Sequence, residues 1–176
     1  MSQGHQIRTY WIRSALTSWV AVGALLCLVV FGGFYAARIY LDTEVPLVVA
    51  EGISMQPAIR EGDILVFRGV EPDEIEVGDI IIFEVPDELE EILPSHITHR
   101  VIDKKATADG VVFRTKGDNA PLDSFEVPED KVLGKKIAII PYLGLIILLA
   151  KRPLGIAALV VGFIVVSVSS MLSKKE

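Results

Sequence analysis

The chain reads ITHRVIDKKATADGVVFRTK over residues 97–116, with an apolar run on either side of Asp109-Gly110. The two runs, Ile97–Ile102 and Val111–Thr115, are rich in the residues that favour β-strands. Glycine after aspartate supplies the positive φ that tight turns between strands require. The stretch therefore predicts a β-hairpin.

Four further runs of the same kind surround this hairpin: Val45–Val49, Ile64–Phe67, Ile80–Val85 and Val132–Ile140. They are bounded by Gly-Asp and Pro punctuation, and no good amphipathic helix separates them. This pattern favours a mainly β fold, a compact all-β domain over residues 42–140, over alternating βαβ units.

Two long uncharged stretches flank this domain: the 24 residues Ser14–Ala37 and the 20 residues Leu154–Ser173. About 20 apolar residues in a helix cross a hydrocarbon core about 30 Å thick, so we expect a transmembrane helix at each. The first, residues 14–37, is longer than the apolar core of a cleaved signal peptide and is predicted to be a retained signal anchor. Residues 141–153 are too short to cross and are expected to lie at the interface or to complete the core.

The charges are segregated along the chain. Residues 42–150 hold 22 of the 23 acidic groups and 10 of the 17 basic groups, a net charge of −12. An acidic domain without a basic stripe argues against a nucleic-acid partner. Basic residues accumulate on the cytoplasmic side of spans, and Arg8 and Arg13 precede the first stretch while Lys174 and Lys175 follow the second. Residues 1–13 and 174–176 are therefore predicted to be cytoplasmic, with the β domain on the outer face.

Three short motifs contain residues that could carry chemistry. Ser54 lies in Gly52–Pro57 (GISMQP), directly after a predicted strand, and needs an activating base. His99 could supply that base, because imidazole exchanges protons near neutral pH. If its segment is a strand, His96 and His99 point to opposite faces, which disfavours a shared metal. A carboxylate in the turn-rich loop 116–123 could accept the second imidazole N–H.

The motifs occur in an order that closely resembles the type I signal peptidases, over roughly Glu44 to Leu145. The matching blocks are Gly-x-Ser-Met-x-Pro at 52–57, Gly62-Asp63, Gly78-Asp79, His99-Arg100-Val101 and Lys116-Gly117-Asp118-Asn119. Bacterial members have a lysine as the general base, whereas the archaeal and endoplasmic-reticulum branch has histidine at the matching position. Because that position is His99 here, the chain resembles the second branch.

The resemblance implies that Ser54 is the nucleophile and His99 its general base. It also implies an oxyanion and substrate site formed by the main chain around Ser54, with Gly52, Ile53 and Met55 beside it. The orienting acid stays open between two residues. This branch usually has its acid six residues after the Asp of Gly-Asp-Asn, a position that is Ser124 in this chain. Asp123, one residue earlier, is the nearest carboxylate and is preferred, and Asp118 remains the alternative.

The implied activity is that of a membrane-bound serine endopeptidase that removes signal peptides after small residues. The expected partners are signal-peptide-bearing precursors, the lipid bilayer and the translocon, and no cofactor or metal is implied. The cell membrane is the expected location, with several spans. Cys27, the single cysteine, lies inside the first apolar stretch, which excludes intrachain disulfides.

Three other functions fit parts of the sequence. A non-catalytic membrane-anchored β-domain subunit of a secretion complex would be expected to lack the serine, the histidine or the acidic loop. A self-cleaving LexA-like regulatory protease would be soluble and use a lysine base. A metal-dependent hydrolase would need His96 and His99 to converge on one ion. The small-x-small tract Val48-Val49-Ala50 is a possible point of self-cleavage that the sequence leaves open.

Overall fold

The computed structural model describes residues 3–89 and 91–172, and the chain divides into two compact units between Leu41 and Asp42. The predicted cytoplasmic tail, residues 174–176, lies outside the described residues. So do the last residue of the predicted second span and the first two residues of the predicted N-terminal segment.

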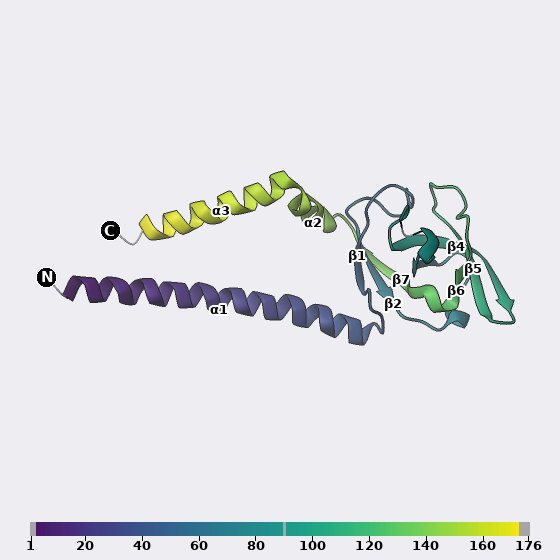
Figure 1. Ribbon diagram of the computed structural model, residues 1–176, viewed down its shortest axis with the longest axis horizontal. Coiled ribbons are helices and arrows are strands. Elements are labelled where there is room, and N and C mark those ends of the chain that lie inside the picture. The colour runs from purple at the N-terminus through teal and green to yellow at the C-terminus, as the bar shows by residue number, and fades with distance from the viewer. Residues whose placement is uncertain (1–2, 90, 173–176) are drawn as a thin grey trace. The chain divides into compact units, whose positions relative to one another are not determined.

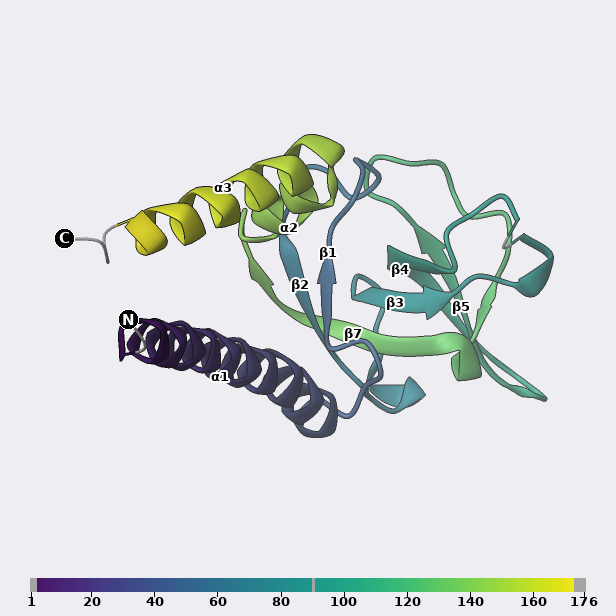
Figure 2. The ribbon, with the colours of Figure 1, turned by 60° about the vertical axis from the view of Figure 1, so that its left-hand side comes forward.

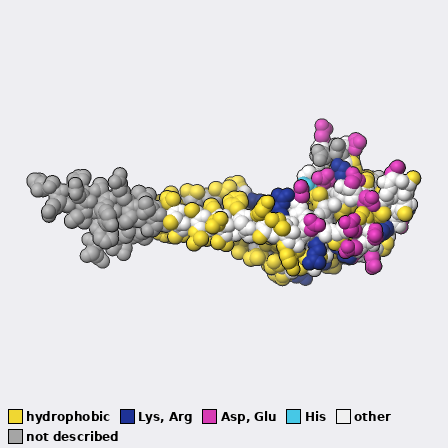
Figure 3. Space-filling view, turned by 90° about the horizontal axis from the view of Figure 1, so that it is seen from below, with side chains coloured by type: hydrophobic (Ala, Val, Ile, Leu, Met, Phe, Trp, Pro, Cys, Tyr) yellow, Lys and Arg dark blue, Asp and Glu magenta, His cyan; other side chains and the backbone are white. Residues whose placement is uncertain are grey.

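The first unit is a single long helix, α1, Gln3–Tyr40 (Figure 1). Its stretch Trp19–Tyr40 has 22 residues and a mean hydropathy of 2.3, and none of its apolar window is buried within the protein. At 1.5 Å per residue this stretch is about 33 Å long, enough to cross a hydrocarbon core. The helix could therefore span a membrane, as predicted, and it continues beyond Ala37 to Tyr40. In Figure 3 hydrophobic side chains cover the surface of the helices, whereas acidic side chains gather on the β domain of the second unit.

The second unit is built on one seven-stranded antiparallel sheet with the order β1-β2-β7-β3-β4-β5-β6 (Figure 2). Its strands are β1 Leu47–Val49, β2 Ile64–Arg68, β3 Ile80–Glu84, β4 His96–Thr107, β5 Gly110–Lys116, β6 Val127–Pro128 and β7 Val132–Ile140. Three short 3₁₀ turns lie between strands: η1 Pro72–Glu74, η2 Asp87–Leu89 and η3 Glu129–Lys131. The predicted mainly β fold is confirmed, and each of the six predicted strands is present.

The predicted hairpin is formed by β4 and β5. Thr107 pairs with Gly110, and Gly110 has a φ of 124°, in the region that favours glycine. The register shifts between Val101 and Asp103, which marks a bulge in β4. His99 lies near the start of β4, and the tight turn of the hairpin lies at its end.

Strand β3 lies in the middle of the sheet and is buried on both faces. Ile80 and Ile82 belong to one core cluster, whereas Ile81 and Phe83 belong to a second. Side chains alternate between the faces of a strand, so an uninterrupted apolar run contributes to two cores at once. The first cluster also contains Met55, so the core that holds β3 also holds the loop between β1 and β2.

The C-terminal segment forms two helices, α2 Gly144–Lys151 and α3 Pro153–Leu172. Arg152 between them is extended, with φ −75° and ψ 146°, because proline disfavours a helical conformation in the residue before it. Within residues 3–89 and 91–172, only α1 is by itself long and apolar enough to cross a membrane. The pair α2 and α3 passes the same test only when taken together, bent by 94° at the break. The expectation of one continuous C-terminal span is therefore not supported, and a second span remains a proposal.

Candidate active site

The loop of residues 50–63, called the Ser54 loop below, connects β1 to β2. Two main-chain hydrogen bonds close its base: Ala50 N–H donates to Asp63 O over 2.8 Å, and Gly62 N–H donates to Ala50 O over 2.9 Å. Ser54 itself is half-buried. The loop is thus a closed unit anchored on two paired strands, which gives its backbone a fixed course.

The residues beside Ser54 differ in what they present to solvent. The Met55 side chain is only 5% exposed and packs in the first core cluster, which leaves its main chain as the part that could meet a substrate. Ile53 is 60% exposed. Gly52 has a φ of 87°, and no heavy atom lies within 4 Å of a Cβ built on it. Glycine at position 52 is therefore favoured by backbone conformation and not by lack of space.

The two strand histidines lie in different surroundings. His99 pairs with Ile81 of β3 and is buried, whereas His96 is exposed with its Nδ1 3.2 Å from Ser95 Oγ. The Nδ1 of His99 lies 2.8 Å from Oδ2 and 3.0 Å from Oδ1 of Asp123. An ionised carboxylate can only accept, so this contact assigns the proton of the neutral ring to Nδ1 and leaves a lone pair on Nε2.

The Asp123 carboxylate is held from its other side by Thr115 in β5. Thr115 Oγ1 donates to Asp123 Oδ2 over 2.7 Å, and Asp123 N–H donates to Thr115 O over 3.2 Å. Thr115 is fully buried. Sequence reasoning did not single out Thr115, although a threonine at the end of an apolar strand must find a partner when buried. That requirement is the signal that could have found it.

The loop after β5 brings the serine and histidine segments to one place. A Cβ built on Gly117 would lie 2.7 Å from Ser54 O and 2.9 Å from His99 Nε2. Asn119 N–H donates to Ser54 O over 2.7 Å, and Asn119 Nδ2 donates to Ile53 O over 3.3 Å. Glycine at 117 therefore permits a close approach of three segments, and Asn119 attaches the Ser54 loop to the loop that follows β5.

Asp118, the other candidate acid, is paired with Arg100 and not with His99. Arg100 Nε and Nη2 each donate to one oxygen of Asp118 over 2.7 Å. The hydrogen bonds from Arg100 hold the pKa of Asp118 below its usual value, with smaller attractions from Arg100, His99 and Lys116, while partial burial opposes the shift. The same interaction raises the pKa of Arg100. The structure thus brings His99 together with Asp123 and commits Asp118 to a different partner.

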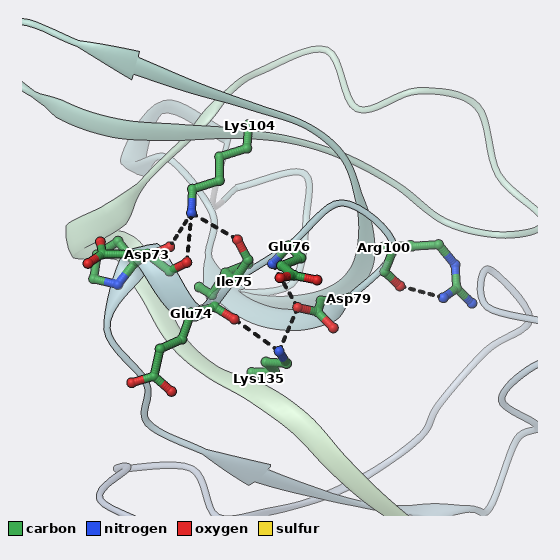
Figure 4. A network of polar contacts seen from close by, with 10 residues as sticks. Asp73, Glu74, Ile75, Glu76, Asp79, Arg100, Lys104 and Lys135 are labelled. Atoms are coloured by element: carbon green, nitrogen blue, oxygen red, sulfur yellow. Dashed lines mark hydrogen bonds and ion pairs between the residues drawn. The ribbon is translucent and has the colours of Figure 1, made fainter.

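Arg100 lies beside a network of polar contacts that fixes the chain segment leading into β3 (Figure 4). It donates through Nη1 to Gly78 O over 2.7 Å. Lys104 Nζ donates to three main-chain carbonyls in and after η1, at 2.8 to 3.1 Å. Lys135 Nζ lies 2.7 Å from Asp79 Oδ2. The Gly78-Asp79 block therefore fixes the chain course and connects through Arg100 to the loop of Asp118.

The described residues contain no group of three or more His, Cys, Asp or Glu side chains placed to hold a metal ion. Cys27 is exposed on α1. One pocket contains none of the predicted site residues in its lining, which is formed by Pro57, Ala58, Arg60, Asp63, Ile139, Pro141 and Tyr142. The arrangement of chemical interest is instead the His99 imidazole, whose Nδ1 contacts the partly buried carboxylate of Asp123 and whose Nε2 lies beside Gly117. An imidazole held in this way can accept a proton at Nε2 and return it.

A protein-family model described as Peptidase S24-like matches residues 31–93. The matched segment covers the end of α1, the whole Ser54 loop and strand β3. It ends before His99.

Individual relatives match a larger part of the chain. The signal peptidase complex catalytic subunit SEC11 of Colletotrichum graminicola is 33% identical over 156 residues, which cover 78% of this chain and 87% of the relative. The SEC11 subunit of Fusarium vanettenii is 30% identical over 154 residues, with the same two coverages. The human subunit SEC11C is 32% identical over 113 residues, 59% of this chain and 56% of the relative.

Proposed function

Because the chain belongs to the SEC11 family of signal peptidase catalytic subunits, the endoplasmic-reticulum and archaeal type, we propose that it removes signal peptides from translocated precursor proteins. In this proposal it acts as a membrane-anchored serine endopeptidase that cleaves after small residues. Ser54 is the nucleophile, His99 the general base, and Asp123 the acid that orients the base.

The observation that carries the proposal is the hydrogen bond between His99 Nδ1 and Asp123, with Thr115 supporting the carboxylate. A carboxylate at Nδ1 keeps Nε2 free to accept a proton and stabilises the imidazolium that forms. Nε2 lies next to Gly117, which also contacts the main chain of Ser54. These contacts give the imidazole the tautomer and the neighbourhood that a serine nucleophile needs.

The mechanism follows from these contacts. Ser54 Oγ attacks the scissile carbonyl while His99 Nε2 takes the hydroxyl proton. His99 then returns that proton to the leaving amine, which departs as the new N-terminus of the mature protein. Water, deprotonated by the same imidazole, hydrolyses the ester between Ser54 and the signal peptide. Main-chain N–H groups at Ser54 and its neighbours stabilise the tetrahedral oxyanion.

Asp118 has a positioning role in this account. Its bidentate pair with Arg100 fixes the loop that follows β5. Asn119, the next residue, holds Ser54 O, so the ion pair supports the relative position of nucleophile and base without contacting the reacting atoms.

The substrate is expected to bind in an extended form next to β1. Strand β1 is at the edge of the sheet, and a peptide can add to an exposed edge through main-chain hydrogen bonds. The Ser54 loop starts where β1 ends, so a strand along residues 45–51 would lead the scissile bond to the nucleophile. The exposed Ile53 side chain would border the pocket for a small residue.

The proposal includes an orientation in the cell membrane. α1 serves as the anchor over residues 14–37, and the C-terminal segment 154–173 provides a second crossing. Arg8 and Arg13 before the first segment and Lys174 and Lys175 after the second favour cytoplasmic termini. Residues 42–140 then lie on the outer face and residues 141–153 at the interface. The bilayer and the translocon are the proposed surroundings, since cleavage sites emerge there. Tethering near that point raises the effective substrate concentration.

The direct test uses the full-length protein in membranes with a precursor that has a small-x-small cleavage site. Ser54→Ala should abolish cleavage, and Ser124→Ala, a matched change at an exposed serine beside Asp123, should leave it unchanged. Mass spectrometry of the products identifies the bond that is cut. Cleavage that persists in Ser54→Ala, or that a metal chelator abolishes, would refute the assignment.

A further inference from the structure

Helix α2 begins in direct contact with the base of the Ser54 loop, next to the end of β1 (Figure 2). A Cβ built on Gly144 would lie 2.6 Å from Val49 Cγ1 and 2.8 Å from Gly62 O. A Cβ on Gly62 would in turn overlap the side chain of Leu145. The two backbones can approach this closely only because both positions are glycine.

The Asp63 carboxylate links the Ser54 loop to the segment that enters α2. Asp63 is only 4% exposed, and both of its oxygens accept main-chain hydrogen bonds. Oδ2 accepts from Arg60 N–H at 2.9 Å, inside the loop, and Oδ1 accepts from Tyr142 N–H at 3.0 Å, before the helix. Tyr142 has a φ of 62°, which is uncommon for a residue with a side chain. The carboxylate therefore holds the conformation that turns the chain from β7 into α2.

Two more contacts join the same segments. Lys151 Nζ, in the last residue of α2, lies 2.8 Å from Oε1 of Glu51, near the start of the loop. Arg60 Nη1 donates to the Tyr142 hydroxyl. Both pairs are exposed and contribute little energy by themselves. They show, however, that each end of α2 faces the Ser54 loop.

We propose that α2 and Asp63 act as a brace that positions Ser54 for attack. The inference rests on the proposed function and goes beyond it, because it makes the C-terminal segment part of the machinery that sets the reaction rate. The loop is held by Asn119 at Ser54 O and by the brace at its base. Releasing the base allows the serine to move relative to His99, and a displacement of about 1 Å can reduce a rate by about a hundredfold.

The experiment compares Gly144→Ala with Gly162→Ala in the full-length protein. Both changes add one methyl group to a C-terminal helix, but nothing lies within 4 Å of a Cβ on Gly162. Gly144→Ala should reduce kcat for precursor cleavage by roughly tenfold to a hundredfold with KM changed less than about twofold. Hydrogen exchange should increase at the amides of Arg60 and Gly62, which donate within the loop, while the β4–β5 hairpin stays protected. Gly162→Ala should match the wild type in every readout.

A second variant guards against misfolding of the first. Asp63→Asn keeps the size of the side chain, but an amide oxygen can replace only one of the two carboxylate acceptors. It should produce the same loss of kcat and the same local exchange. Unchanged exchange at the loop, or faster exchange without loss of kcat, would overturn the brace. If the wild type cleaves no precursor, the proposed function fails, while the exchange result still decides whether α2 holds the loop.

Discussion

Replacing the two candidate acids separately should have very different consequences. Asp123→Asn puts an amide where the carboxylate now accepts from His99 Nδ1 and Thr115 Oγ1 at 2.8 and 2.7 Å. When the amide nitrogen faces the ring, the neutral imidazole must carry its proton on Nε2, and the base is lost. For an orienting aspartate in a Ser-His-Asp site this tautomer change costs about 10⁴-fold in kcat, or about 5 kcal/mol.

The partner variant Asp118→Asn should lose much less. Asp118 interacts with Arg100, the two side chains are 19% and 33% exposed, and asparagine retains an oxygen that can accept from the guanidinium. A pair of this kind is worth about 1 kcal/mol or less, so kcat should fall less than about tenfold. Both variants are assayed by single-turnover cleavage of one precursor at saturating enzyme. Near-normal activity of Asp123→Asn together with an inactive Asp118→Asn would refute the reasoning.

Three further predictions concern Thr115, Gly117 and the ion pair of Asp118. Thr115→Val keeps the shape of the side chain but removes a hydrogen bond to a charged group, so kcat should fall by roughly tenfold to a hundredfold while the domain stays folded by circular dichroism. Gly117→Ala should abolish measurable cleavage, because its Cβ would displace Ser54 or His99, and full activity in this variant would show that the close approach is not needed. The ion pair of Asp118 should stabilise the domain in a pH-dependent way. The pKa of Asp118 is lowered in the folded state, so this stability is present above the unfolded pKa and is lost as pH falls through the folded pKa. Denaturant unfolding of wild type and Asp118→Asn should therefore differ at neutral pH and converge in acid.

The sequence predicted the β domain well because its signals are local. Residue type and bounding turn residues are enough to predict the two strands around Asp109-Gly110 and the apolar strand β3. Strand β6 was missed because its two residues, Val127 and Pro128, are too few to form a pattern. Hydropathy also predicted a second span over residues 154–173, but the helix found there, α3, passes the test of length and hydropathy only together with α2, across a bend of 94°.

The residues of the candidate site were harder to assign because their partners are distant along the chain. Motif order led to Ser54 and His99, but the acid depends on how the loop after β5 folds back. The pairing of Lys116 with Leu122 returns that loop to the strand and places Asp123, not Ser124, opposite Thr115. Spacing along the sequence could not decide between the two acids, because the pairing of Arg100 with Asp118 becomes visible only in the folded structure.

In the proposed mechanism, peptide cleavage passes through an ester on Ser54. Intact-protein mass spectrometry of full-length enzyme, quenched in acid during turnover of a precursor, tests it most directly. We expect a species heavier by the acyl mass of the signal peptide, attached at Ser54 and absent from Ser54→Ala. An adduct on a different residue, or continued cleavage by Ser54→Ala, would contradict it.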